Sequence, residues 1–427
     1  MAEILPFRGL YYNPSKVDLS KVLSPPYDVI SPQEQEELYA RDPRNVVQLE
    51  FGKETDRYAS ATKFVQDWRS DGTLNYDVEP SVYLLCQRFR DKSGRLIRRK
   101  GFLALCKLED PETKTVLPHE KTFSKPKEDR LELLVHARAM FSPIFSIYVD
   151  PSRLLESIYD EVSKESPFLA GELESVSGDV WKVGDTETIG KLQALLRNRQ
   201  VFIADGHHRY ETALEYQRRR RSENRSHSGS EGYNYSLMYF TNVVEPGLVI
   251  YPIHRVIQGV RDFRREAFLA ELAKQFNVEP VGTPERLVLE LRARARFTFG
   301  IALKSDAPYY LAGLRDGSGI DKLIPQEIPR ELKDLDVVLL HAYIIPQVLR
   351  VDTQSGQARI RMDFIKDEFK AIASVQKGHA QIAFLLNPTP VEQVQAVARA
   401  GLTMPQKSTY FYPKLPAGLV MYDLDRH

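Results

Sequence analysis

The stretch that most constrains the fold is VFIADGHHRYETALEYQ, residues 201–217, because its apolar pattern changes period part-way along. The run at 201–204 is apolar and short, which is typical of a buried strand. Four later residues share the stripe of one helix face: Tyr210, Ala213, Leu214 and Gln217. The sequence therefore predicts a strand, a tight turn and a helix that begins near residue 206 or 207.

The polar residues at this turn form the first candidate site. We expect Asp205 at or just before the N-cap, and Gly206 allows the tight turn. A helix N-terminus attracts anions, and Arg209 adds a fork-shaped cation, so the turn outlines a phosphate site. In the alternative reading, Asp205 only caps the helix and His207 and His208 lie on the surface. A single metal ion held by both histidines is excluded, because adjacent side chains point about 100° apart on a helix; one histidine ligand remains open.

A second candidate lies in LPHEKTFSKPKEDRLELL, residues 117–134. Glu120 is a carboxylate that can act as a general base, and the surrounding cations can meet phosphate charge. These polar neighbours are His119, Lys121, Lys125, Lys127 and Arg130. The alternative is a charged loop that leads into a helix.

A third candidate is MPQKSTYFYPKLPAGL, residues 404–419. Lys407, Ser408 and Thr409 resemble the end of a P-loop, but the glycines of that motif are missing, so this is no Walker sequence. The prolines and aromatics, with Lys414, make a rigid segment that either walls a pocket or packs as a closure. Three further candidates have a structural reading as well: Asp28 after a diproline, and His254 and Arg255 at the end of a strand.

Elsewhere the pattern predicts mixed strands and helices, which indicates an α/β or mixed α+β fold. Ser31, Pro32 and Glu34 predict a capped helix over 31–43. A strand is expected at 45–51, and a β-hairpin around residues 92–94.

Composition narrows the class of protein. The 59 basic and 58 acidic residues give a net charge of +1, which disfavours a protein that coats nucleic acid or an anionic membrane. Cys86 and Cys106 have no metal-site spacing and are interpreted as reduced core thiols. The sequence shows neither a signal peptide nor an apolar run of about 20 residues, so we expect a soluble cytoplasmic protein.

Four motifs, PPYDVI, HEKTFSKPKEDR, ADGHHRY and MPQKSTYFYPK, together resemble one uncharacterised prokaryotic family, domain of unknown function 1015. The resemblance runs from Pro6 to the C-terminus. GHHRYETA (206–213) is also similar to the GxxRxxxA box of the ParB/sulfiredoxin-like superfamily, where the box holds nucleotide phosphates. Free serine kinases of that superfamily carry a similar DGHHR sequence and phosphorylate free L-serine with a nucleotide and Mg²⁺.

This resemblance implies a ParB-like core with additional elements: a nucleotide-binding catalytic region at 1–260, and an α/β region at 261–427 whose segment 404–419 returns to the site. It implies ATP or ADP as donor, Mg²⁺ held by Asp205, and L-serine as acceptor. A homodimer remains open. The resemblance places Asp205 as an essential acid and the rest of the box around the phosphates; Glu120 is our choice of base on chemistry alone. The roles expected on these grounds are catalytic for Glu120, Asp205 and His208; phosphate-binding for Gly206, His207, Arg209, Lys407, Ser408, Thr409 and Lys414; and substrate-binding for Asp28, His119, Arg130, His254 and Arg255.

Two other classes of function remain open. One is a ParB-like nucleotide-binding switch or DNA-associated protein, although neither a helix-turn-helix nor a basic face is evident. The other is a nucleotide- or metal-dependent hydrolase that uses His119 or His208 as a base.

Overall fold

The computed structural model describes residues 2–120, 124–304, 308–315, 319–350 and 360–426, without the side chains of 124–126. The chain divides into two compact units. Unit 1 comprises Met1–Pro118, Thr122–Val249 and Pro413–His427, and unit 2 comprises His119–Lys121 and Ile250–Tyr412. The chain passes from unit 1 to unit 2 between Val249 and Ile250, whereas the sequence predicts a boundary after residue 260. The reason is that β14 (His254–Gln258) pairs with β18 and β19 of unit 2.

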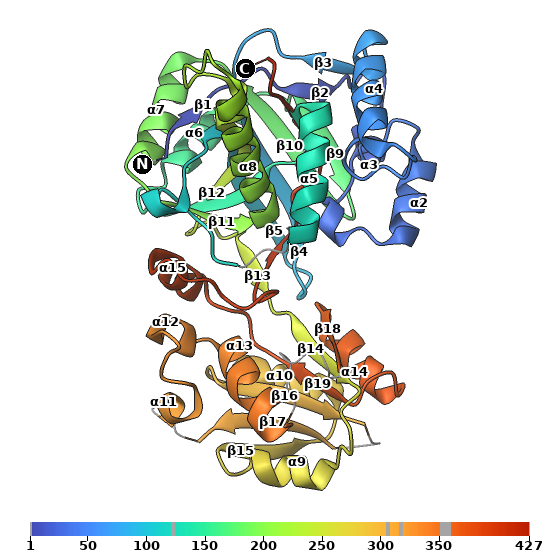
Figure 1. Ribbon diagram of the computed structural model, residues 1–427, viewed down its shortest axis with the longest axis vertical. Coiled ribbons are helices and arrows are strands. Elements are labelled where there is room, and N and C mark those ends of the chain that lie inside the picture. Colours follow the sequence, from blue (N-terminus) through green and yellow to red (C-terminus); the bar gives the residue numbers. More distant parts are fainter. Residues whose placement is uncertain (1, 121–123, 305–307, 316–318, 351–359, 427) are drawn as a thin grey trace. The chain divides into compact units, whose positions relative to one another are not determined.

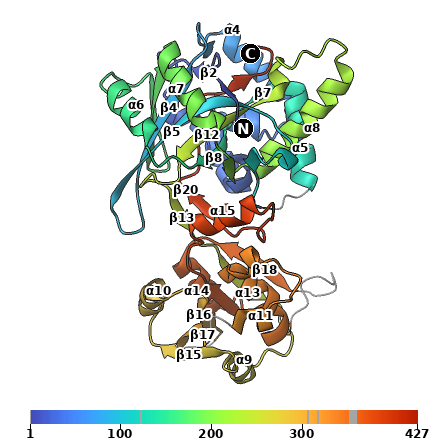
Figure 2. The same cartoon turned by 90° about the vertical axis from the view of Figure 1, so that its left-hand side faces the viewer.

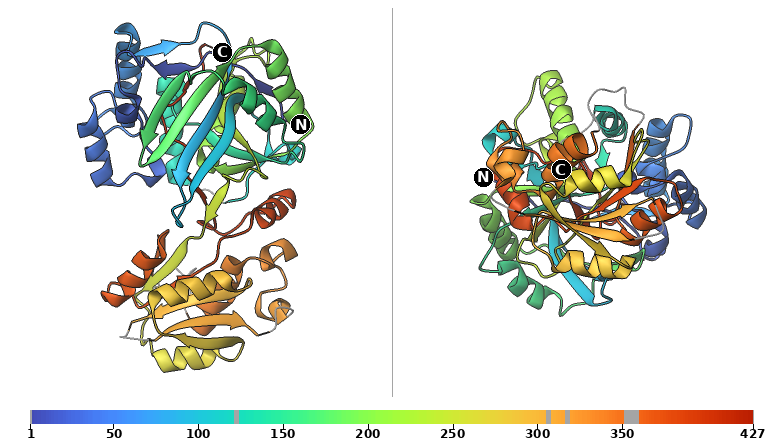
Figure 3. Two further views of the ribbon diagram at one scale, coloured as in Figure 1. Left: turned by 180° about the vertical axis from the view of Figure 1, so that it is seen from behind. Right: turned by 90° about the horizontal axis from the view of Figure 1, so that it is seen from below.

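Unit 1 is built on a nine-stranded mixed sheet in the order β6-β11-β8-β12-β5-β4-β10-β9, with β1 paired to β5. Its strands are β1 (Ile4–Leu5), β4 (Val82–Arg90), β5 (Leu96–Lys107), β6 (Val116–Leu117), β8 (Ile144–Tyr148), β9 (Leu169–Leu173), β10 (Val176–Val183), β11 (Val201–Asp205) and β12 (Tyr235–Asn242). The pairs β11–β6 and β12–β8 are parallel and the other pairs are antiparallel. Strands β4 and β5 form a hairpin, and they lie side by side when unit 1 is seen from behind, in the left view of Figure 3.

The helices of unit 1 are α1 (Leu19–Val22), α2 (Pro32–Arg41), α3 (Val47–Glu50), α4 (Arg57–Ser70), α5 (Ser124–Ala137), α6 (Leu154–Val162), α7 (Thr186–Arg197) and α8 (His207–Glu223). Of these, α6, α7 and α8 pack on one face of the large sheet through one apolar core. Alternate strand residues such as Leu84, Phe102 and Met238 face α6, α7 and α8, as the two-residue period of a strand requires. Helices α5 and α8 lie side by side in Figure 1, where unit 1 also carries α2, α3 and α4.

Two small sheets complete unit 1. They pair β2 (Leu10–Tyr12) with β3 (Leu74–Tyr76), and β7 (Ala139–Met140) with β21 (Tyr422–Asp423). The second pair ties the segment after Pro413 into this unit.

Unit 2 is a three-layer arrangement around a six-stranded antiparallel sheet, order β15-β17-β16-β19-β14-β18. Besides β14, the large sheet and the helices of unit 2 comprise β15 (Phe276–Val281), β16 (Thr298–Leu303), β17 (Tyr309–Leu314), β18 (Arg361–Ile365), β19 (Ile382–Leu385), α9 (Arg265–Leu272), α10 (Pro284–Ala293), α11 (Ile320–Leu323), α12 (Arg330–Lys333), α13 (Asp336–Leu339), the π-helix Leu340–Val348, α14 (Glu368–Gln376) and α15 (Val391–Arg399). A two-stranded sheet pairs β13 (Val249–Tyr251) with β20 (Tyr410–Tyr412). One face of the six-stranded sheet packs on α10 and α14, and the other on α9, α13 and the π-helix. Figure 2 shows α10 and α14 labelled together beside these strands.

The mixed fold class expected from the sequence is confirmed. Helix α2 begins with the predicted capping box between Ser31 and Glu34, and β4 and β5 form the predicted hairpin.

The strand expected at 45–51 is wrong: the segment forms the short helix α3. The Asn45 side chain accepts a hydrogen bond from the Val47 amide at 3.0 Å and donates to the carbonyls of Lys21 and Leu23. These bonds bend the chain into a helical turn, which outweighs the β preference of the apolar run.

Candidate functional site

The turn between β11 and α8 sets the position of the DGHHR residues. Gly206 has φ +93°, a conformation that residues with a Cβ rarely adopt, and an added Cβ would lie 2.9 Å from the Arg209 Nη2 atom. Helix α8 begins at His207, as predicted, and buries Tyr210, Ala213 and Leu214 in the core of unit 1. Strand, turn and helix therefore hold Asp205 and Arg209 in one fixed arrangement.

Asp205 lies between two cations. Its Oδ2 atom is 3.1 Å from Arg209 Nη2, and its Oδ1 atom pairs with the ammonium of Lys414. Burial raises the pKa of Asp205, but the charges of Lys414 and Arg209 outweigh this effect and lower the pKa to about 2. Asp205 is therefore a carboxylate at neutral pH.

The hairpin strands hold the backbone on either side of Lys414. The buried Arg99 donates to the Pro413 carbonyl at 2.6 Å, and Gln87 donates to the Lys414 carbonyl at 3.3 Å. Because both donors come from β4 and β5, the sheet fixes where the Lys414 ammonium meets Asp205.

Arg209 also connects this ion pair to a buried carboxyl group. Its Nη1 atom donates to the hydroxyl of Ser142 at 3.1 Å and to the Pro143 carbonyl. Ser142 in turn donates to Oε1 of Glu50, which is 5% exposed. Burial raises the pKa of Glu50, while Arg209 and Arg130 oppose the shift.

Arg130 approaches Glu50 from α5. It donates to the Glu50 carbonyl at 2.6 Å and to Asp129 at 2.9 Å, and its guanidinium lies 4.1 Å from the ring centroid of Tyr27. Asp28, the next residue after Tyr27, is exposed, and its charge contributes to the shifts at Tyr27 and Glu50. The two predicted substrate residues of unit 1, Asp28 and Arg130, are thus brought near Glu50.

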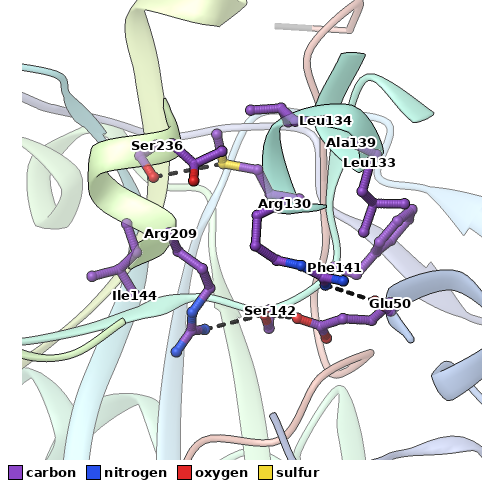
Figure 4. Close-up of a pocket in the computed structure, with 12 residues that line it drawn as sticks. Glu50, Arg130, Leu133, Leu134, Ala139, Phe141, Ser142, Ile144, Arg209 and Ser236 are labelled. Carbon is purple, nitrogen blue, oxygen red and sulfur yellow. Dashed lines mark hydrogen bonds between the residues drawn. The ribbon is translucent and has the colours of Figure 1, made fainter. Parts of the chain in front are cut away.

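A cavity of about 60 Å³ opens between these groups and α5, α8 and β7. Figure 4 shows Arg209 and Glu50 pointing toward Ser142 from opposite sides, with Arg130 beside Glu50. The polar lining is Glu50, Arg130, Ser142, Arg209, Thr212 and Ser236, and the apolar lining is Leu133, Leu134, Ala139, Met140, Phe141 and Ile144.

The other predicted residues gather in unit 2. Segment 119–120 pairs with Met404, and the Met404 amide donates to the His119 carbonyl at 2.8 Å. The Glu120 carboxylate accepts a hydrogen bond from the Lys407 amide, and His119 Nε2 lies 3.2 Å from the Thr409 hydroxyl. The Glu120 side chain is thus held by the backbone amide of Lys407.

The remaining members of this group differ in exposure. Ser408 is buried and donates to the Pro405 carbonyl, whereas the Lys407 side chain is exposed. Lys121 lies outside the described residues, as do the side chains of Ser124, Lys125 and Pro126.

His254 and Arg255 are buried in β14. His254 Nδ1 accepts from the Leu386 amide at 3.2 Å, and its Nε2 atom is 3.8 Å from Glu368. Arg255 donates to His341 at 3.3 Å; burial lowers the pKa of Arg255 to about 10, and Glu120 opposes the shift. Burial and the Arg255 charge lower the pKa of His341 to about 3, so its imidazole is neutral at physiological pH.

Sequence reasoning missed Glu50, Ser142 and His341. Glu50 carried a usable signal, because a glutamate inside the apolar run VVQLEF needs a polar or charged partner if that run is buried. Ser142 and His341 carried none, because their partners are distant in the sequence.

Within the described ranges, no group of three or more His, Cys, Asp or Glu residues is arranged to hold a metal ion. No helix in the part of the chain that the structure describes is long and apolar enough to cross a membrane. Cys86 and Cys106 are free and buried, as predicted.

A protein-family model described as "Protein of unknown function (DUF1015)" matches residues 4–338. The chain belongs to this family. No curated protein matches the DUF1015 chain.

Solved structures similar to the DUF1015 chain share little sequence with it. A free serine kinase in complex with AMP is 13% identical, with a TM-score of 0.36 and coverage of 73% of this chain and 90% of the other. A conserved hypothetical protein from Pyrococcus furiosus is 11% identical, with a TM-score of 0.35 and coverage of 73% and 93%. SbnI with a C-terminal truncation, from Staphylococcus aureus, is 8% identical, with a TM-score of 0.33 and coverage of 73% and 84%. At these values the likeness decides nothing about activity.

Proposed function

We propose that the protein is a small-molecule kinase that transfers a phosphoryl group from ATP or ADP to the hydroxyl of free L-serine, giving O-phospho-L-serine. The observation that carries the proposal is the partly buried arrangement of Asp205, Arg209 and Lys414 where β11 turns into α8. The similarity of the DGHHR box to that of free serine kinases supports the choice of reaction and acceptor.

The chemistry required is positioning and charge. The serine hydroxyl oxygen forms a bond to the terminal phosphorus, the bond from that phosphorus to the bridging oxygen breaks, and the nucleotide leaves one phosphate shorter. Arg209 and the amides at the start of α8 are suited to phosphate oxygens, with His207 and His208 in the same turn. Lys414 supplies a second cation, and Asp205 holds both cations in place.

Mg²⁺, when bound with the nucleotide, neutralises phosphate charge. Proteins often hold it through one or two carboxylates together with substrate phosphates, and Asp205 is the carboxylate of the box that fits this role. To act as a ligand, Asp205 has to release Lys414 or Arg209, and phosphate oxygens are the natural new partners of those cations. The proton of the hydroxyl has to pass to a base, for which Glu120 is the candidate from the sequence.

The test is to incubate the purified chain with L-serine, Mg²⁺ and either ATP or ADP, and to look for O-phosphoserine by mass spectrometry. The proposal expects product that depends on both serine and nucleotide, and loss of product in Arg209→Ala. Nucleotide consumed without O-phosphoserine indicates a hydrolase. Nucleotide bound but not consumed indicates a ParB-like switch.

A further inference from the structure

Two side chains that line the cavity of unit 1 each carry a buried oxygen atom without a hydrogen-bond partner among the described residues. The two atoms are Oε2 of Glu50 and Oγ1 of Thr212, and these side chains are 5% and 4% exposed. Leaving such an atom unpaired carries a desolvation penalty, and the penalty is larger for a charged group. Such an atom calls for an explanation, and a ligand that supplies the missing partner is one.

The same cavity holds opposite charges a short distance apart. The hydroxyl of Ser142 bridges Oε1 of Glu50 and Nη1 of Arg209, so one small group spans the gap between carboxyl and guanidinium. Arg130 places a second guanidinium on the Glu50 side. A molecule whose ammonium and carboxylate are separated by one carbon atom matches this spacing and this order of charge.

We propose that this cavity is the acceptor subsite and takes a small α-amino acid. Its ammonium donates to Oε2 of Glu50, and its carboxylate accepts from Arg130 and Arg209. The term acceptor rests on the proposed function, whereas the binding of an amino acid does not.

Size and lining limit the side chain of this amino acid. One water molecule needs about 10–15 Å³, and the cavity volume of about 60 Å³ is several times larger. The cavity therefore admits a group of a few non-hydrogen atoms. Leu133, Phe141 and Ile144 wall the remaining space with apolar atoms. Thr212 is a polar partner for a short hydroxyl-bearing side chain, which favours serine over larger or charged amino acids.

Binding is measured by isothermal titration calorimetry without nucleotide, so that turnover plays no part. The probes are L-serine, ethanolamine, which lacks the carboxylate, and N-acetyl-L-serine, which lacks the ammonium. The wild-type chain is expected to bind L-serine, and each analogue at least about tenfold more weakly, the factor that 1.4 kcal/mol represents.

Three variants test the cavity itself. Glu50→Gln keeps the shape but removes the charge, and Thr212→Val replaces the unpaired hydroxyl with a methyl group. Each is expected to weaken L-serine binding by about tenfold or more. Ala139→Leu fills the cavity from β7 and is expected to abolish binding. The control is Thr73→Val, which alters a buried threonine of unit 1 outside the cavity lining.

The outcomes separate this inference from the proposed function. Serine binding that is unchanged in folded Glu50→Gln and Ala139→Leu, or no binding of serine to the wild type, overturns the inference. O-phosphoserine formed at the wild-type rate by those variants overturns it as well, and leaves the proposed function standing. The chain can also bind serine with the expected pattern and yet make no O-phosphoserine. That result upholds the inference and excludes the proposed reaction.

Discussion

Lys414 and Asp205 form an ion pair between positions 209 residues apart in the sequence, inside unit 1. Their side chains are 14% and 15% exposed, so solvent screens the pair only in part. The contact ties the segment that follows Pro413 to the start of α8, and it sets the charge of the DGHHR box.

The acid stability of the chain is expected to depend on this pair. The pKa of Asp205 is about 2 in the folded protein, and about 3.9 is the usual value for an unfolded chain. A lowered pKa stabilises the fold above about pH 4, and this contribution is lost as the pH falls toward about 2. In Lys414→Met we expect a lower melting temperature at pH 7 and a difference from wild type that shrinks below about pH 3.

Melting curves from pH 2 to pH 7 check this expectation. Lys191→Met is the control, because Lys191 forms an exposed pair with Glu187 and is expected to change little. A difference between Lys414→Met and wild type that is constant over the whole range would show that the charge of Asp205 is not involved.

Nucleotide affinity is expected to depend on Arg209. Arg209→Ala removes charge-assisted hydrogen bonds worth about 1.5–3 kcal/mol, so the dissociation constant for ATP or ADP should rise by about 10- to 100-fold. Calorimetry measures this directly. The control is Arg219→Ala on the same helix, where Arg219 is exposed and pairs with Glu223. Equal losses in both variants would point to general charge rather than to the box.

Asp205→Asn is expected to separate binding from turnover. The amide keeps the shape of the side chain but removes the negative charge beside Arg209 and Lys414. The net positive charge at the box rises, which favours the binding of phosphate. Nucleotide affinity should therefore stay within about threefold, while turnover falls by about 10²–10³-fold, as when a charge that positions the transition state is lost. If affinity, turnover and melting temperature all collapse together, Asp205 serves the fold and not the reaction.

The sequence predicts Glu120 as the general base. Glu120→Gln is expected to lower turnover by about 10²–10⁴-fold with little change in nucleotide affinity. Because Glu120 also accepts a hydrogen bond from the Lys407 amide, a melting curve has to accompany the rate.

A control is Glu112→Gln, an exposed carboxylate of unit 1 that precedes the stretch 117–134. A folded Glu120→Gln chain that keeps turnover within about threefold of wild type removes Glu120 from the reaction. Asp28 and Asp205 are then the next carboxylates to change.

Local signals predicted the local parts of this structure. The Ser31–Glu34 capping box, the β4–β5 hairpin and the start of α8 at His207 each depend on residues a few positions apart, and each is confirmed. The prediction of a strand at 45–51 failed because the deciding contacts are not local: Asn45 bends the chain by donating to carbonyls more than twenty positions away.

Non-local contacts decided the rest of the candidate site. The sequence put Glu120, Asp205 and Lys414 in one set, whereas the structure places Glu120 with Lys407 in unit 2 and Lys414 with Asp205 in unit 1. The apolar run around Glu50 signals a carboxylate that needs a partner, but it does not indicate that the partners are Ser142 and Arg130, which lie about 80–90 positions later in the chain. Spacing in a sequence carries no information about such partners.

Unit 1 contains Pro413–His427, which follow all of unit 2 in the chain. During synthesis the early strands emerge first, but β7 lacks its partner β21 and Asp205 lacks Lys414 until Pro413–His427 leave the ribosome. Unit 2 has the whole of Ile250–Tyr412 available by then. A ribosome that stalls within unit 2 therefore yields a nascent chain whose DGHHR box carries Arg209 but not its second cation.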